Sequence, residues 1–205
     1  MTGEIIDRIV LASASPRRYD LLRSLGLEVE RAPSGYGEPS LHGVTPETLA
    51  AIHARAKLAA AIARGVPQGV AVVAADTVVD VDGEVLGKPL DAHDAARMLA
   101  VLSGREHRVH TAFSLRLPGR NAAIEEIATT TVGFYALSAD EIATYVASGE
   151  PFDKAGGYGI QGRAAALVAR IAGDFYTVMG FPLARFVRAL RRSGFSLPAA
   201  KPVAP

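Results

Sequence analysis

The run Val70-Ala71-Val72-Val73-Ala74-Ala75 constrains the fold more than any other segment, because it offers no polar face to water. A continuous apolar strand of this kind is typical of the centre of a sheet that is covered on both faces. Shorter strand-like runs at residues 9–12 and 27–32 alternate with helical patterns along the chain. This alternation predicts an α/β architecture.

Capping residues mark the starts of the predicted helices, because a side-chain oxygen can accept from a free N–H group of the first turn. Ser15 followed by Pro16 begins one helix, and Ser138 with Glu141 forms a capping box at another. Asp82-Gly83 between apolar runs is a strong hairpin signal. The other expected elements are helices from Thr45 to about Arg64, from Asp91 to Gly104 and from Pro182, strands at residues 108–117, 125–135 and 165–172, and a glycine-rich loop at 149–162.

Length and composition indicate one globular domain. A chain of 205 residues with 49% apolar and 21% charged residues can bury a sizeable core. We expect residues 1–197 to form a single domain of two lobes and the Pro/Ala-rich residues 198–205 to form a flexible tail. The start of the chain does not resemble a signal peptide, and no apolar run approaches membrane-spanning length. We therefore expect a cytoplasmic protein with no membrane partner.

Cysteine usage and charge exclude several function classes. The chain has no cysteine, which excludes disulfides, thiolate catalysis and Cys-based zinc sites. The formal net charge of +1 argues against broad electrostatic binding of nucleic acid, and only 6% of the residues are aromatic, too few for a stacking platform. Nucleic acid is therefore not an expected partner.

The segment Ser13-Ala14-Ser15-Pro16-Arg17-Arg18 predicts an anion-binding site. It follows the strand at residues 9–12 and opens a helix, whose first-turn N–H groups attract anions. Two arginines at this end oppose the helix dipole, so their position needs another reason, and a phosphate-bearing ligand is one. The alternative is an ordinary capped helix with a solvated arginine pair.

Asp76 and Lys88 are further candidates for chemistry. Asp76 follows the central apolar run, and we expect it at the carboxyl end of that strand, where ligands of α/β sheets gather. A carboxylate there needs a metal ion, a cation or a substrate proton as its partner. The alternative is that Asp76 caps a turn through Thr77. Lys88 follows a glycine that allows close approach of an anion. The segment lacks the pattern of a Walker A loop, and a lysine of this kind taken singly is more often a surface lysine.

The loop Gly157-Tyr158-Gly159-Ile160-Gln161-Gly162 matches a dinucleotide-binding pattern in spacing only. The residues before it are not strand-like and no clear helix follows, so we reject that interpretation. Gln161 nevertheless offers both a donor and an acceptor to a base edge. His107 and His110 would point to opposite faces of a strand, which disfavours a shared metal and favours satisfied or solvent-facing histidines.

Four motifs occur together and in order: Ser-x-Ser-Pro-Arg-Arg at residues 13–18, Ala-Asp-Thr-Val-Val at 75–79, Gly-Lys-Pro at 87–89, and Asp-Lys-Ala-Gly-Gly-Tyr-Gly-Ile-Gln-Gly at 153–162. In this combination the chain resembles the Maf family of nucleoside triphosphate pyrophosphatases, over about residues 9–190. The last motif, with Gln161, resembles the dTTP/UTP branch of that family. The resemblance implies an elongated, mixed-sheet, two-lobed Maf/ITPase-like α/β fold with a deep central cleft, usually found as a homodimer.

The resemblance also assigns roles to individual residues. It implies catalysis by Asp76, phosphate contacts by Ser13, Arg17, Arg18, Lys57 and Lys88, base selection by Arg17, Thr77 and Gln161, and a divalent cation, Mg²⁺ or Mn²⁺, held by Glu38 and Asp76. The expected reaction splits a nucleoside triphosphate into the monophosphate and pyrophosphate. The family often carries an Asp-x-Asp-Glu run at Glu38, of which Gly35-Tyr36-Gly37-Glu38 keeps only the last acid.

Two other functions are consistent with the same cleft. One is a nucleotide-binding regulator of septum formation and cell division, which needs the cations but no reactive carboxylate. The other is a pyrophosphatase for a different triphosphate, either modified or purine. Product analysis with a panel of triphosphates discriminates among all three.

Overall fold

The computed structural model describes residues 4–199. A seven-stranded mixed sheet forms its centre, with the strand order β3-β2-β4-β6-β7-β8 and with β5 paired to β4. The sheet strands are β2 (Arg8–Leu11), β3 (Glu28–Arg31), β4 (Ala71–Val81), β5 (Glu84–Leu86), β6 (Glu106–Arg116), β7 (Ile124–Phe134) and β8 (Val168–Ala172), and β1 (Glu4–Ile5) pairs with β9 (Phe195–Ser196) in a small second sheet.

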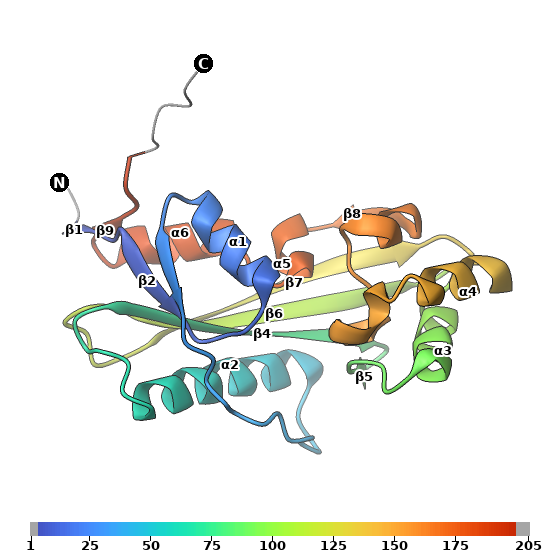
Figure 1. Ribbon diagram of the computed structural model, residues 1–205, viewed down its shortest axis with the longest axis horizontal. Helices are drawn as coiled ribbons and strands as arrows, with labels where there is room; N and C mark the ends of the chain where they lie inside the picture. The colour runs from blue at the N-terminus through green and yellow to red at the C-terminus, as the bar shows by residue number, and fades with distance from the viewer. Residues whose placement is uncertain (1–3, 200–205) are drawn as a thin grey trace.

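Helices cover both faces of the central sheet (Figure 1). They are α1 (Pro16–Ser24), α2 (Pro46–Ala63), α3 (Ala92–Leu102), α4 (Ala139–Ala147), α5 (Phe175–Met179) and α6 (Leu183–Arg192), with short 3₁₀ turns at Glu150–Asp153, Ala155–Gly157 and Gly162–Ala166. In Figure 1, α2 lies below the sheet, α1, α5 and α6 lie above it, and α3 and α4 lie together at one end. The long strands β4, β6 and β7 run from one end of the sheet to the other. The lobe with α1, α2 and α6 and the lobe with α3, α4 and the glycine-rich loop therefore share one sheet.

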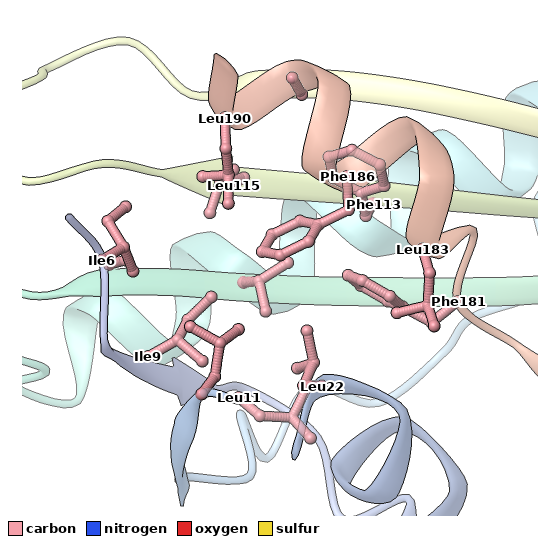
Figure 2. Packing of buried hydrophobic residues seen from close by; sticks show 14 of the residues in the cluster. Ile6, Ile9, Leu11, Leu22, Phe113, Leu115, Phe181, Leu183, Phe186 and Leu190 are labelled. Atoms are coloured by element: carbon pink, nitrogen blue, oxygen red, sulfur yellow. The ribbon is translucent and has the colours of Figure 1, made fainter. Parts of the chain in front are cut away.

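The core is divided between the two faces of β4, because successive side chains of a strand alternate. On one face Val73 and Ala75 join a cluster with α1, β6 and α6, in which Phe113, Phe181 and Phe186 are fully buried (Figure 2). Farther along the same face of β4, residues 79 and 81 pack against α3, α4 and the glycine-rich loop. On the opposite face, residues 72, 74 and 78 pack against α2.

One edge of β4 has a gap in its pairing. Strand β2 pairs in parallel with residues 71–73 of that edge, and β5 pairs antiparallel with residues 79–81. The other edge is occupied by β6 along residues 72–80. Residues 74–78 therefore border an opening between β2 and β5 on one edge, while β6 pairs with them on the other edge.

Most of the predicted elements are confirmed. Ser15, Thr45 and Asp91 cap α1, α2 and α3, and the capping box of Ser138 with Glu141 begins α4. Asp82 and Gly83 form the hairpin turn with φ values of 53° and 91°, as a two-residue turn requires.

Three local predictions were wrong. Asp76 does not end its strand, because β6 pairs with β4 without interruption through Asp76 and Thr77. For the same reason Asp76 does not cap a turn. The strand expected from residue 165 begins only at Val168, after a 3₁₀ turn, and α5 and the β1–β9 pair were not predicted. The tail expected at residues 198–205 lies outside the described residues from residue 200 onward.

Candidate active site

A cavity of about 810 Å³ opens at the gap in the β4 edge. Its walls come from the loop before α1, from α2, from β4, from the segment after β5 and from the glycine-rich loop, so both lobes contribute. All nine residues singled out from the sequence line it: Ser13, Arg17, Arg18, Glu38, Lys57, Asp76, Thr77, Lys88 and Gln161. The structure therefore brings the set together, and the individual roles stay predictions.

Two carboxylates meet one lysine at the centre of the site. Lys57 Nζ lies 2.6 Å from Asp76 Oδ1 and 2.6 Å from Glu38 Oε1. Asp76 and Lys57 are buried, at 5% and 8% exposure, whereas the Glu38 side chain is half exposed. Burial raises the pKa of Glu38, but the hydrogen bond from Lys57 and the positive charges of Lys57 and Lys88 outweigh it and leave the pKa lowered. Lys57 and Lys88 thus favour the anionic form of Glu38.

Helix α2 supplies the lysine because its buried face lies on the sheet. Leu49, Ala50, Ala54 and Leu58 pack onto β4, and Lys57 extends from that face to Asp76. Thr45 caps the helix by accepting from the Thr48 N–H, with Pro46 at the first position. A lysine inside this apolar face is costly without a partner, so its carboxylates are needed for stability as well as chemistry.

Thr77 lies next to Asp76 but faces the other side of the sheet, where Arg18 reaches it. Arg18 Nη2 donates to Thr77 Oγ1 at 3.0 Å, and Arg18 Nε donates to the Gly180 carbonyl at 2.9 Å. Burial lowers the pKa of Arg18, partly offset by the charge of Asp76. Two of the N–H donor groups of Arg18 therefore already bind protein oxygens.

A directed hydrogen-bond chain continues behind Thr77. Thr111 Oγ1 donates to the Thr177 carbonyl at 2.7 Å, which uses its one hydroxyl proton. The 2.9 Å contact between Thr77 Oγ1 and Thr111 Oγ1 must then take its proton from Thr77. Thr77 thus accepts from Arg18, donates to Thr111, and has only acceptor capacity left for a ligand.

Arg17 reaches across the mouth of the cavity to the opposite lobe. Its Nη1 atom lies 3.1 Å from Asp153 Oδ2, and Lys154 Nζ lies 2.5 Å from the other oxygen of that carboxylate. Burial raises the pKa of Asp153, but Lys154 and Arg17 together lower it further than burial raises it. Sequence reasoning named the 153–162 motif but missed Asp153 as a partner, since 136 residues separate it from Arg17.

Lys88 and Gln161 are exposed residues on the rim of the cavity. The glycine-rich loop lies close to the segment after β5, because the Gly156 N–H donates to the Gly87 carbonyl at 2.9 Å. Gly156 has a φ of +70°, and a Cβ atom there would lie 3.0 Å from the Val79 side chain. Only glycine lets the loop approach β4 this closely.

The described residues contain no group of three or more His, Cys, Asp or Glu side chains suited to a metal ion. Glu38 and Asp76 nevertheless offer two carboxylates that converge on one point, now held by Lys57. Mg²⁺ is commonly bound by one or two carboxylates together with substrate phosphates and water. The pair therefore offers ligands of the kind that such a cation takes.

The two histidines of the 107–110 segment are buried and hydrogen-bonded within the protein, as expected, except that His107 Nδ1 has no partner among the described residues. His107 Nε2 lies 2.7 Å from the Tyr158 hydroxyl, and His110 lies between Thr129 Oγ1 and Asp80 Oδ2. Asp80 also accepts from the Gly83 N–H at 2.7 Å and so anchors the β4–β5 hairpin. No sequence motif predicted the Asp80–His110 pair.

Comparison with known proteins agrees with this geometry. The family model described as Maf-like protein matches residues 8–193. The chain belongs to the Maf family. Among curated Maf relatives, the dTTP/UTP pyrophosphatase of Thermus thermophilus is 50% identical over 91% of this chain and 95% of its own length, and that of Anaeromyxobacter dehalogenans is 47% identical over 95% and 98%. The dTTP/UTP pyrophosphatase of Bacillus velezensis is 45% identical over 90% of this chain and 95% of its own.

More remote comparisons add little to the Maf assignment. The solved structure of the Staphylococcus aureus Ham1 protein covers 62% of this chain and 71% of its own, at 16% identity and a TM-score of 0.43, which is too distant to assign function.

Within residues 4–199, no helix is both long enough and apolar enough to span a membrane.

Proposed function

We propose that this Maf protein hydrolyses dTTP and UTP to the nucleoside monophosphate and pyrophosphate. The observation that carries the proposal is the contact of Lys57 with the buried Asp76 and with Glu38, inside a cavity that Arg17, Arg18 and Lys88 also line. The names of relatives at 45–50% identity support the same substrates. A regulator that only binds nucleotides needs no carboxylate that takes a proton from water.

In the proposed mechanism Asp76 orients a water molecule and takes its proton as the water oxygen attacks phosphorus. The bond to the oxygen that bridges the α and β phosphates breaks, and pyrophosphate leaves with the electron pair. Arg17, Lys57 and Lys88 hold the phosphates and offset the charge that builds on the leaving group. A divalent cation bound by Glu38 and Asp76 would supply further charge neutralisation.

Lys57 links substrate binding to the readiness of Asp76. In the free protein its ammonium group binds both acids. A triphosphate entering the cavity adds strong acceptors for the same ammonium protons, so Lys57 can turn toward the phosphates and release Asp76 to accept a proton. The base is thereby freed only when substrate is present.

Base selection is proposed for the side of the cavity that holds Thr77. Thymine and uracil carry a donor at N3–H, whereas cytosine has an acceptor at N3. Because the proton of Thr77 is committed to Thr111, the Thr77 hydroxyl favours a base edge that donates. Gln161 adds a donor and an acceptor on the rim, and Arg17 completes the set predicted from the resemblance.

The resemblance to the Maf family further supports a homodimer, which size-exclusion chromatography with light scattering measures directly. A cytoplasmic location follows from the proposed substrates, since nucleoside triphosphates are metabolites of the cytoplasm. With a formal net charge of +1, nucleic acid is not proposed as a partner.

The deciding experiment offers the purified protein dTTP, UTP, CTP, purine triphosphates and modified nucleotides with Mg²⁺ or Mn²⁺. We expect equimolar monophosphate and pyrophosphate from dTTP and UTP. Release of inorganic phosphate instead would place the cleaved bond elsewhere. Tight binding without any product would support the nucleotide-binding regulator of septum formation, and product from another triphosphate alone would change the substrate.

A further inference from the structure

The loop that carries Glu38 has no regular secondary structure and contains two glycines. Residues 32–41 form neither helix nor strand, and Gly35 and Gly37 flank Tyr36. Glycine gives the backbone the most conformational freedom of any residue, so such a loop is costly to order. Glu38 nevertheless lies 2.6 Å from Lys57, which requires the loop to hold one conformation.

Three alternate side chains of this loop, at residues 34, 36 and 38, are buried or reach a buried partner. Ser34 is buried, Tyr36 is half-buried, and Glu38 reaches the buried ammonium of Lys57. Tyr36 contacts His53, with its hydroxyl 3.3 Å from His53 Nδ1 and the ring centroids 5.8 Å apart. His53 is only 4% exposed and belongs to α2, four residues before Lys57.

These contacts form two parallel connections between the loop and α2. Two residues of extended chain span about 6.6 Å, and four residues of helix rise about 6 Å. Residues 36 and 38 of the loop therefore match residues 53 and 57 of the helix in spacing. The Tyr36–His53 contact fixes the loop one helical turn away from the place where Glu38 meets Lys57.

We propose that Tyr36 and His53 are positioning residues that hold Glu38 against Lys57 in the active site, an inference that rests on the proposed function. Their hydrogen bond adds a second attachment of the loop to α2, beside the single ion pair between Glu38 and Lys57. The contact is 3.3 Å long, and a tyrosine hydroxyl can either donate to or accept from an imidazole nitrogen. Neither residue takes part in the reaction itself.

Tyr36→Phe tests the inference with the smallest change, since it removes the hydroxyl and keeps the ring. We expect kcat for dTTP to fall roughly three- to tenfold, the scale of one hydrogen bond, with a smaller change in KM. His53→Leu should match it, and His53→Asn, which keeps a polar group near the Nδ1 position, should recover part of the loss. Tyr135→Phe, at a tyrosine 57% exposed and outside the cavity lining, is the matched control and should leave kcat unchanged.

A double-mutant cycle with Glu38→Gln separates positioning from a general structural effect. If Tyr36 acts through Glu38, Tyr36→Phe should have little further effect on kcat in the Glu38→Gln background. An equal fall in both backgrounds, or wild-type kcat in Tyr36→Phe, would overturn the inference.

Hydrogen exchange provides a readout that needs no turnover. Tyr36→Phe should speed exchange of the amides at residues 34–41 in the nucleotide-free protein, while the amides of β4 keep their protection. Unchanged exchange in that loop would also overturn the inference. This test decides the question even if the turnover of the Glu38→Gln variant is too slow to measure in the double-mutant cycle. Failure of the proposed function is a separate result, because the wild-type protein itself would then release no pyrophosphate from dTTP or UTP.

Discussion

Acidification should destabilise this protein through His107. The imidazole is 3% exposed and lies between Phe134 and Tyr158, with ring centroids 5.2 and 5.3 Å away. Burial lowers the pKa of His107 from 6.5 to about 4. Protonation would place a charge in the apolar cluster beside α3 and α4, where, among the described residues, the Nδ1 atom has no hydrogen-bond partner.

The size of the effect follows from the two pKa values. As the pH falls below 6.5 the unfolded chain takes up a proton at His107 and the folded protein does not, so the free energy of unfolding decreases. A folded pKa of about 4 gives a loss of about 2 kcal/mol between pH 7 and pH 5. The loss approaches about 3 kcal/mol once the pH passes below the folded value.

Urea unfolding at pH 7 and pH 5 measures this loss, with His107→Phe as the variant that cannot titrate. His107→Phe will be less stable at pH 7, because the Tyr158 hydroxyl loses its partner, but its stability should fall by about 2 kcal/mol less than the wild type over the same pH range. His93→Gln, at an exposed histidine, is the control and should follow the wild type. Parallel pH dependence in the wild type and His107→Phe would refute the reasoning.

The remaining predictions concern the active site. Asp76→Asn should lower pyrophosphate release from dTTP by roughly 10²–10⁴ while the protein stays folded, because Lys57 keeps Glu38 as its partner; near-normal release would exclude Asp76 as the base. Gln161→Ala should change the ranking of dTTP, UTP and CTP more than the rate with the best substrate, and an unchanged ranking would place base readout elsewhere. Thr111→Val removes the acceptor of the Thr77 proton, so it should narrow the preference for UTP over CTP, even though the fully buried Thr111 side chain cannot touch the substrate. Thr111→Ser keeps the hydroxyl and should keep that preference. The ratio of kcat/KM for UTP and CTP measures both effects.

Local signals predicted much of the fold because each depends on residues close in sequence. Ser15, Thr45, Asp91 and Ser138 cap their helices by accepting from backbone N–H groups three residues ahead. Hairpin formation at Asp82-Gly83 likewise needs only two residues that accept positive φ. The set of residues that line the cavity was predicted instead from the resemblance to the Maf family, which includes Glu38 and Lys57 outside the four motifs.

Contacts between distant segments were beyond such signals. Arg17 and Arg18 are neighbours with nearly identical sequence surroundings, yet one pairs with Asp153 and the other with Thr77. Successive residues of a helix point about 100° apart, and the partner that each arginine meets depends on how α1 packs against β4 and the glycine-rich loop. Tyr36 and His53 meet for the same kind of reason, through the packing of a loop on a helix.

The position of Asp76 in the middle of β4, and not at its end as expected, matters for the site. A strand end would present Asp76 on a mobile turn, whereas the gap between β2 and β5 exposes it from the middle of a strand that β6 pairs throughout. Because neighbouring side chains of a strand face opposite sides, the gap gives the cavity Asp76 on one face and Thr77 on the other. The proposed base and the proposed base-selecting hydroxyl are thus adjacent on one rigid strand, so a nucleobase seated at Thr77 fixes where its phosphates lie relative to Asp76.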